Sequence, residues 1–396
     1  MNNKTSILSN VLLWFGAAIS IAEIFTGSLF APLGFWRGLL AIIIGHTIGC
    51  CVLYLAGIIG AQRGITAMES VRISFGGKGA MVFSLLNVLQ LVGWTAVMII
   101  SGARAMGVVT GQGAVAELWW CAIIGAFIII WVLIGIKNLG KVNIFAVGAL
   151  FALTLALSFV VFRQGGGNVS HELLSFGAAV ELSAAMPLSW LPLISDYTRH
   201  AEKPRAATAA STVAYFVGSC WMYAIGLAAA LFTGESDIAR IMATAGFGIA
   251  GVLIVLLSTV TTTFLDSYSA GVSLSAISSK INEKWAAVAV CVLGTLLAAF
   301  TPIEQYENFL YLIGSVFAPM VAILVTDVFI LKKDHTAERF NLTNLILWAV
   351  GFVFYRCMMS VDTVLGQTLP VMLVISLLCI LIERVKSKCW KQPSTK

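Results

Sequence analysis

Charged residues are scarce in this chain. Only 11% of the 396 residues are Asp, Glu, Lys or Arg, while 59% are hydrophobic and the mean hydropathy is +0.96. Soluble domains usually carry about 25% charged residues, so the composition excludes an ordinary soluble protein. The longest polar connections, such as 196–205, are only roughly ten residues long, too short for an added soluble domain. We therefore expect a single transmembrane domain over residues 1–396, in contact with a lipid bilayer.

Motifs for metal or covalent chemistry are also lacking. The eight cysteines form no CxxC pair, and the four histidines have no ligand spacing, so we predict neither a metal centre nor a cofactor. We find no HExxH or GxSxG motif in a membrane helix, and we predict that the protein is not an enzyme. The formal net charge of +6 follows from membrane topology and requires no nucleic-acid partner. No feature indicates an obligate protein partner.

Twelve apolar stretches are candidates for crossing a bilayer, which takes about 20 residues in a helix. The first five cover residues 8–32, 38–60, 80–109, 118–136 and 142–162. The next five cover 173–194, 206–232, 246–279, 285–300 and 309–331. The last two cover 342–360 and 367–382. We therefore predict an all-α integral membrane protein with about twelve transmembrane helices.

Lysine and arginine are distributed unevenly over the connections between these stretches. Cytoplasmic loops of membrane proteins carry an excess of both residues. If both termini are cytoplasmic, 19 of the 24 Lys and Arg lie in cytoplasmic segments. The bias predicts a multi-pass protein of the plasma membrane with both termini in the cytoplasm.

The helix order contains a repeat. The first five helices span approximately 7–163, the next five span approximately 172–332, and two additional helices cover 341–384. Because five is an odd number, the second block enters the membrane inverted relative to the first. Inverted repeats with interrupted helices at matching positions are typical of secondary transporters.

The first helix of each block carries helix-breaking residues. Gly16, Gly27 and Pro32 interrupt helix one, and Pro187 and Pro192 interrupt helix six. Proline in a helix interior removes a backbone hydrogen bond, and broken backbone is tolerated in a membrane only inside protein or beside a water-filled cavity. The two broken helices therefore indicate a solute-binding site.

Three carboxylates lie well inside apolar segments: Glu23 in helix one, Glu181 in helix six and Asp266 in helix eight. A buried ionised group in a membrane is costly and usually faces the bundle interior with a function. The alternative is a structural carboxylate satisfied by a hydroxyl group or a helix terminus. We take all three as candidate substrate-binding residues.

Helix eight is rich in hydroxyl groups, with seven Ser or Thr among residues 258–271. Ser258, Thr261 and Thr262 share a helix face. Together with carbonyls freed by the break in helix one, they could bind a hard cation such as sodium. Hydroxyls that only bond back to their own helix or join neighbouring helices are the alternative.

Helix three offers an aromatic platform. Gln90 and Trp94 are four residues apart and share a helix face. An indole ring can stack on a planar substrate, and an amide beside it can bind the polar edge of that substrate. Ordinary packing of Trp94 is the alternative.

The motifs together resemble the nucleobase–cation symporter-1 family over nearly the whole chain. Four stretches carry the likeness, namely GAAISIAEIFTG (16–27), QRGITAMESVRISFGGKGA (62–80), SDYTRH (195–200) and FLYLIGSVFAPMVAILVTDVFILKK (309–333). The resemblance implies the LeuT-like 5+5 inverted repeat, with broken helices one and six and two additional C-terminal helices. It further implies a pyrimidine substrate driven by a cation gradient, with sodium as the expected ion.

The resemblance also carries over individual residues. The family's helix-three tryptophan corresponds to Trp94, and its helix-six substrate contacts fall near Met186 and Pro187. Its sodium ligands correspond to four positions, the backbone carbonyls of Gly16 and Ser20 and the side chains of Thr261 and Thr262. Ser258 stands where the cytosine-permease branch has an asparagine.

Within the family the chain is most similar to the cytosine-permease branch and its hydroxymethylpyrimidine transporters. It departs from the cytosine pattern at the 261–264 run, at the Gln90–Trp94 spacing and at Glu23, where the branch has a small residue. A carboxylate can bind the amidine-like edge of an aminopyrimidine with two hydrogen bonds. We therefore predict import of hydroxymethylpyrimidine, a thiamine precursor, with cytosine or another nucleobase as the alternative.

Several alternatives stay open at this stage. Protons could replace sodium as the coupling ion, because Glu23 or Asp266 could carry one. A transporter for amino acids on the same fold would want a cation or helix terminus for the substrate carboxylate, which an acidic site disfavours. A channel would show a selectivity-filter-like repeat, and we see none in the sequence.

Overall fold

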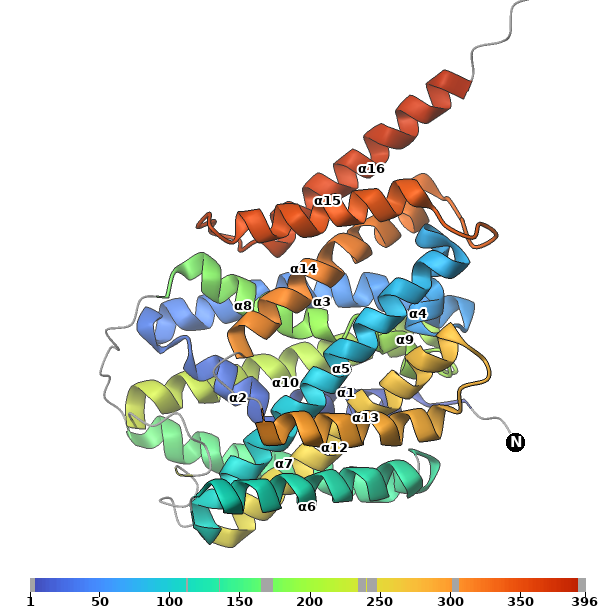
Figure 1. Ribbon diagram of the computed structural model, residues 1–396. Coiled ribbons are helices and arrows are strands. Elements are labelled where there is room, and N and C mark those ends of the chain that lie inside the picture. Colours follow the sequence, from blue (N-terminus) through green and yellow to red (C-terminus); the bar gives the residue numbers. More distant parts are fainter. Residues whose placement is uncertain are drawn as a thin grey trace, which may run out of the picture.

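The computed structural model describes residues 4–111, 113–134, 136–164, 174–233, 240, 248–300 and 306–390. Within these residues the regular elements are helices, and one isolated bridge joins Thr5 to Ala201. Figure 1 shows the helices packed side by side, with α16 projecting from the top of the bundle.

The first block contains α1 (Ile7–Ala18), α2 (Ile21–Ser28), η1 (Ala31–Leu33), α3 (Phe35–Arg63), α4 (Ala67–Ser70), α5 (Arg72–Thr110), α6 (Ala114–Ile134) and α7 (Ile136–Gln164). The second block contains α8 (Phe176–Ser189), α9 (Ile194–Thr198), α10 (Pro204–Thr233), α12 (Gly248–Ile277), α13 (Glu283–Phe300), α14 (Tyr306–Val325) and η3, a π-helical turn (Thr326–Leu331). Two further helices follow, α15 (Leu342–Met358) and α16 (Thr368–Trp390).

The predicted spans correspond to these helices in order. In the described part of the chain, eight helices are long and apolar enough to cross a membrane, and the bent pair α1–α2 makes a ninth. The remaining predicted spans correspond to α7, α12 and α15. Residues 135, 173, 246 and 247, which the prediction placed in spans, lie outside the described residues.

Helix one breaks at Ile19 and Ser20, where α1 and α2 meet at an angle of 48°. None of the glycines or prolines that suggested an interruption lies at this point. Ser20 has an extended backbone, and its hydroxyl oxygen accepts the Glu23 N–H at 3.3 Å as the N-cap of α2. Ser-x-x-Glu is a helix-start pattern, so α2 begins as a new helix.

Helix six breaks between its two prolines. Pro187 lies in the last turn of α8, and residues 190–193 separate α8 from α9. Pro192 lacks an N–H and disfavours helical backbone in the residue before it. Tight turns replace the helix, with the Leu193 N–H donating to the Trp190 carbonyl at 3.0 Å.

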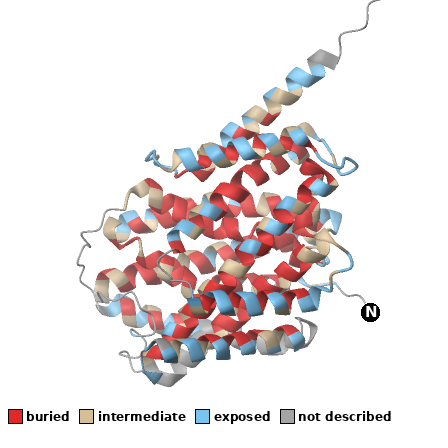
Figure 2. Ribbon diagram, in the orientation of Figure 1, coloured by how far each residue is buried: buried red, intermediate tan, exposed pale blue. Residues whose placement is uncertain are grey.

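The packing of the two blocks is reciprocal. The second helix of the first block, α3, lies along α8, and the second helix of the second block, α10, lies along α1 and α2. The third helices, α5 and α12, pack against each other. Each broken helix is therefore held by the opposite block, as an inverted repeat requires. Figure 2 shows the buried residues concentrated in these central helices.

Glycines permit the close approach in both pairs. A Cβ atom on Gly45 of α3 would lie 2.4 Å from the Cβ of Ser183 in α8. One on Gly226 of α10 would lie 1.9 Å from the carbonyl oxygen of Ile24 in α2. The backbones can approach this closely only because these positions have no side chain.

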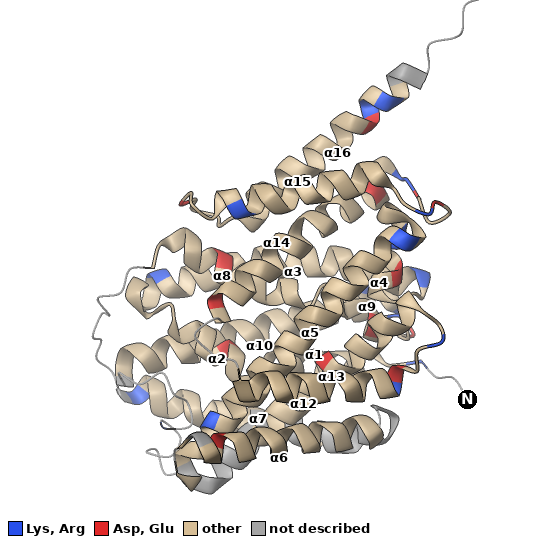
Figure 3. Ribbon diagram, in the orientation of Figure 1, with Lys and Arg blue, Asp and Glu red and all other residues tan. Residues whose placement is uncertain are grey.

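Charge is concentrated at the ends of the helices. Figure 3 shows most Lys, Arg, Asp and Glu at the two edges of the bundle, with few acidic residues inside it. The N-terminal segment pairs with the turn between α9 and α10, since the Thr5 N–H donates to the His200 carbonyl at 2.8 Å. The N-terminus thus lies at the same end of the bundle as the turn between α9 and α10. Arg199, Lys203 and Arg205 are at or next to this turn in the sequence. The side of the membrane on which this end lies stays a prediction.

Candidate functional site

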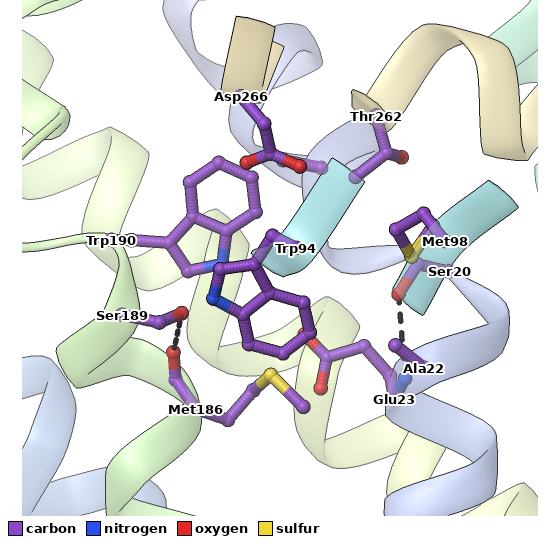
Figure 4. Close-up of a pocket in the computed structure, with 11 residues that line it drawn as sticks. Ser20, Ala22, Glu23, Trp94, Met98, Met186, Ser189, Trp190, Thr262 and Asp266 are labelled. Atoms are coloured by element: carbon purple, nitrogen blue, oxygen red, sulfur yellow. Dashed lines mark hydrogen bonds between the residues drawn. The ribbon is translucent and has the colours of Figure 1, made fainter. Parts of the chain in front are cut away.

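A buried pocket lies where the two broken helices meet α5 and α12. Its lining residues are Ala17, Ser20, Ala22 and Glu23 from helix one, Trp94 and Met98 from α5, Met186, Ser189 and Trp190 from helix six, and Thr262 and Asp266 from α12. Figure 4 shows these side chains converging from the different helices. The cavity volume is about 20 Å³, which is room for about one water molecule.

Two tryptophans form the aromatic walls. Trp94 meets Tyr306 and Phe309 edge-on, with ring centroids 5.9 and 5.6 Å apart, and its indole N–H is buried without a partner. Trp190 meets Trp14 edge-on at 5.5 Å. Aromatic rings around them therefore hold both tryptophans in place, and the Trp94 N–H is free to donate to a ligand.

Asp266 brings an unpartnered carboxyl group to the pocket. Its residue is only 4% exposed, yet no described residue donates a hydrogen bond to it. Figure 4 shows the carboxyl group beside the ring of Trp190. Buried polar groups without a partner are rare and call for an explanation, and a ligand in the pocket would supply one.

Glu23 also lines the pocket, but both oxygens of its carboxylate already accept hydrogen bonds from α10. One oxygen accepts the Tyr215 hydroxyl at 2.7 Å and the other accepts the Ser219 hydroxyl at 2.6 Å, both from α10. Each carboxylate oxygen has a second lone pair. Glu23 can therefore contact a ligand and remain bound to α10.

The predicted cation ligands lie at the break in helix one. The Ser258 hydroxyl donates to the Ile19 carbonyl at 2.8 Å, and the Thr262 hydroxyl is buried without a partner. Ser20 lines the same pocket as Thr262. The Thr261 hydroxyl instead donates to the Ser258 carbonyl at 3.0 Å within α12.

Gly16 lies in α1, one turn before the break, where its carbonyl accepts the Ile19 N–H at 3.3 Å. The carbonyl held by Ser258 is that of Ile19, which the sequence did not single out. In the described part of the chain, no group of three or more His, Cys, Asp or Glu residues could hold a metal ion. Among the described residues, hydroxyl and carbonyl oxygens gather at the break as possible cation ligands, and the Glu23 carboxylate lies in the first turn after it.

Glu181, which the sequence predicted to bind substrate, is not among the residues that line this pocket. One oxygen accepts the backbone N–H groups of Gln367 and Thr368, at 2.6 and 2.7 Å. The other accepts the hydroxyls of Thr368 and Tyr355. Glu181 thus binds the N-terminus of α16, where a negative charge is stabilised, and joins both additional helices to helix six.

Gln90 and Pro187 also stand outside the pocket lining. The Gln90 side-chain amide donates to the Ser189 carbonyl at 2.9 Å, so it supports the pocket wall from behind. Pro187 packs on α3, where a Cβ atom added to Gly49 would lie 2.7 Å from its ring. Of the predicted substrate contacts, the pocket brings together Glu23, Trp94, Met186 and Asp266.

The sequence reasoning missed several residues of this region. Three lining residues were not predicted, namely Trp190, Ser189 and Met98. The first two lie between Pro187 and Pro192, and their place at this break could have indicated them. His46 on α3, set aside because it lacks metal-ligand spacing, is fully buried and bonds to Ser219. An ionisable residue inside an apolar helix was the signal.

Comparison with known proteins gives consistent results. Residues 2–376 match the family of permeases for cytosine/purines, uracil, thiamine and allantoin. The chain is 26% identical to the cytosine permease of Escherichia coli (strain K12) over 353 residues, covering 87% of this chain and 82% of that protein.

Solved structures agree on the fold. The chain is similar to Mhp1, a nucleobase-cation-symport-1 family transporter, in a closed conformation with bromovinylhydantoin bound, with a TM-score of 0.80 and 18% identity over 98% of this chain and 94% of that one. A Na+-coupled sialic acid symporter gives a TM-score of 0.71 and 13% identity over 96% and 88%. The predicted fold, a LeuT-like inverted repeat, is confirmed.

Proposed function

The chain belongs to the family of permeases for cytosine/purines, uracil, thiamine and allantoin, and from this membership we propose that it imports a pyrimidine coupled to sodium entry. Hydroxymethylpyrimidine is our first candidate for the substrate. The transport direction is into the cell across the plasma membrane. The proposal rests on the pocket between the broken helices.

One observation supports an aminopyrimidine as the substrate class: the unpartnered Asp266 carboxyl group lines the pocket together with Trp94 and Trp190. A ring nitrogen beside an amino group offers an amidine-like edge. A carboxylate with a protonated ring, or a carboxylic acid with a neutral ring, forms two parallel hydrogen bonds to that edge. Trp94 and Trp190 would then bound the flat faces of the ring.

Sodium as the coupling ion is supported by the oxygen atoms at the helix-one break. Ser258 donates its proton to the Ile19 carbonyl, and rotation of that proton would present both oxygen atoms to a cation. Thr262 adds a hydroxyl with no competing partner. Sodium prefers such hard oxygen ligands, as do other hard cations.

Cytosine is the second candidate, because the relative that covers 87% of the chain is a cytosine permease. Cytosine also has a ring nitrogen beside an amino group. The two candidates therefore fit the same carboxyl group and differ in the substituents that the pocket must accept.

Uptake into proteoliposomes tests the proposal. Labelled hydroxymethylpyrimidine is offered with and without a sodium gradient, and unlabelled cytosine competes at equal concentration. We expect sodium-stimulated uptake that unlabelled hydroxymethylpyrimidine inhibits more strongly than cytosine. Stronger inhibition by cytosine would favour the second candidate, and uptake independent of sodium would contradict sodium coupling.

Two variants test whether the sodium dependence of uptake comes from Ser258. Ser258→Ala removes the hydroxyl at the break, and we expect a several-fold rise in the sodium concentration for half-maximal uptake. Thr263→Val is the matched control, because the Thr263 hydroxyl bonds only to the Thr259 carbonyl within α12. Equal sodium dependence in both variants would refute the assignment of Ser258.

A further inference from the structure

A chain of buried polar side chains leads away from the pocket through Glu23. The Ser219 hydroxyl lies 2.6 Å from the Glu23 carboxylate and 2.5 Å from Nε2 of His46. Nδ1 of His46 lies 2.7 Å from the Ser183 hydroxyl. The chain therefore joins α2, α10, α3 and α8, and its four side chains are at most 1% exposed.

The position of one proton follows from hydrogen-bond accounting at Nδ1. The Ser183 hydroxyl donates its proton to the Ile42 carbonyl at 2.7 Å. Nδ1 of His46 lies 3.1 Å from the same carbonyl oxygen. Since a carbonyl only accepts, and the Ser183 proton is already used, Nδ1 carries a proton and donates it.

The remaining bonds can be satisfied in two ways. In the first, Ser219 donates to an ionised Glu23, and a doubly protonated His46 donates to Ser219 through Nε2. In the second, a protonated Glu23 donates to Ser219, and Ser219 donates to Nε2 of a neutral His46. The two arrangements contain the same atoms and have the same total charge of zero, and they differ by a shift of protons along the chain.

Other proton counts fit less well. With one proton fewer, Glu23 and Nε2 of His46 are both acceptors, and only the single Ser219 proton lies between them. One acceptor is then unsatisfied and a negative charge is buried, both of which are unfavourable. With one proton more, the network carries a buried positive charge. The buried network therefore favours one shared proton.

We propose that Glu23, Ser219 and His46 form a proton-binding site, and that Glu23 is the end that exchanges this proton with the pocket. Glu23 lines the pocket, whereas His46 is enclosed between α3, α8 and α10. The transporter then binds a proton as well as its substrate and its cation, and substrate binding depends on pH.

Apart from His46 within the site and Asp266 across the pocket, the described titratable groups around Glu23 are tyrosines and cysteines. Tyr215, Cys220 and Tyr223 face Glu23 from α10, Cys50 faces it from α3 and Tyr306 faces it from α14. Tyrosine and cysteine release protons only at alkaline pH in their ordinary state. Among the described residues, no lysine or arginine forms an ion pair with Glu23. Asp266, on α12, is the other carboxyl group at the pocket.

Transfer to a substrate follows directly and rests on the proposed function. From the second arrangement, the O–H bond of Glu23 breaks and an N–H bond forms at a basic ring nitrogen. The products are the Glu23 carboxylate and a protonated ring, which attract each other. The positive charge of the ring then balances the network that has lost its proton.

The first test needs no substrate. Infrared difference spectra of the purified transporter are recorded during a pH titration, and the protonated-carboxyl C=O band that disappears in Glu23→Gln is assigned to Glu23. We expect His46→Gln to move the titration midpoint of this band by about one pH unit or more, a tenfold change in proton affinity. Thr47→Val should leave it unchanged, because Thr47 is exposed on α3 and its hydroxyl bonds to the Ile43 carbonyl within the same helix. Absence of such a band, or an equal midpoint in wild type and His46→Gln, would overturn the proposal.

The second test measures protons exchanged on substrate binding in weakly buffered detergent solution. Hydroxymethylpyrimidine and cytosine are the probes, and binding is confirmed by calorimetry. We expect pH-dependent proton exchange in wild type and Thr47→Val, and its loss in Glu23→Gln. Equal exchange in all three proteins would refute the role of Glu23. Failure of either pyrimidine to bind would refute the proposed function, while the infrared result would still decide the proton site.

Discussion

Asp266 and Glu23 differ in their surroundings, although both carboxyl groups line one pocket. Glu23 is held by two hydroxyl groups of α10, whereas no described residue donates a hydrogen bond to Asp266. A group without partners has the most to gain from a ligand, because its hydrogen bonds to water were lost on burial. Asp266 is therefore the side chain that we expect to bind the substrate edge, and Glu23 the one that handles a proton.

Asp266→Asn should weaken pyrimidine binding. The amide oxygen of the variant can keep one of the two hydrogen bonds, and the variant loses one charge-assisted bond, which contributes about 1.5–3 kcal/mol, so we expect the Kd to rise about 10- to 100-fold. Calorimetry on the purified protein measures it. Ser267→Ala is the control, because its hydroxyl packs against Cys291 and not the pocket. An unchanged Kd in Asp266→Asn would show that another group reads the ring edge.

Helix one and helix six are broken for different physical reasons. Helix six stops because Pro192 cannot continue it, and the sequence reveals this directly. Helix one stops because Ser20 caps a new helix, while its glycines lie inside helical turns. The two carboxylates are also not equivalent: Glu23 follows its break, whereas Glu181 precedes its own by two turns of α8. Glu23 and Glu181 occupy similar places in the two sequence repeats, but they have different contacts in the structure.

Glu181→Gln should destabilise the protein without abolishing substrate binding. The amide oxygen can accept either the two backbone N–H groups of Gln367 and Thr368 or the two hydroxyls of Tyr355 and Thr368, but not both pairs, so hydrogen bonds are lost or must reverse on the side that faces the NH2 group. Each buried group left unsatisfied costs about 1–3 kcal/mol. We expect a lower thermal unfolding midpoint in detergent and a Kd for the pyrimidine close to that of wild type.

Tyr355→Phe provides a graded comparison for this element. It removes one of the hydrogen bonds to Glu181 and leaves the bonds to α16 in place. We expect a smaller decrease in the midpoint than in Glu181→Gln. Loss of binding at an unchanged midpoint in Glu181→Gln would instead return this residue to the substrate site.

The molecule as a whole holds its pocket closed. A cavity of about 20 Å³ has room for roughly one water molecule, and a pyrimidine is larger. The walls must therefore move apart to admit substrate. Met98 and Met186 line the pocket with flexible side chains, but the aromatic and helical walls must also shift. Because α1 and α2 pack on α10 and α8 packs on α3, we expect each broken helix to move together with its neighbour from the opposite block.

Cysteine labelling tests the predicted topology. Thr336→Cys lies in the connection before α15 and Val364→Cys in the connection after it, and both positions are exposed. With cytoplasmic termini, a membrane-impermeant thiol reagent should label Val364→Cys in intact cells. Thr336→Cys should react only after permeabilisation. Wild type gives the background from the native cysteines, and the reverse labelling pattern would invert the predicted orientation.

The sequence by itself determined the membrane setting, the order of the spans and the fold. These depend on the length and order of the apolar stretches, which are local properties of the chain. The orientation that the charge bias predicts stays a prediction. It also identified Trp94, Met186 and Asp266 as residues that meet in one pocket. Helical periodicity indicated Trp94, and the cost of burying a charge in a membrane indicated Asp266, whereas Met186 followed from the family resemblance.

Only the tertiary structure decided what each polar side chain contacts. Glu181 and Glu23 are both carboxylates in apolar helices, and sequence gives no means of telling that one binds the N-terminus of α16 and the other Ser219. His46 carries no motif, and its importance depends on Ser183 and Ser219, more than 130 residues away. Hydrogen bonds between helices depend on which faces pack together. That choice is made by the whole fold, because the reciprocal packing of the two blocks sets every partner at once.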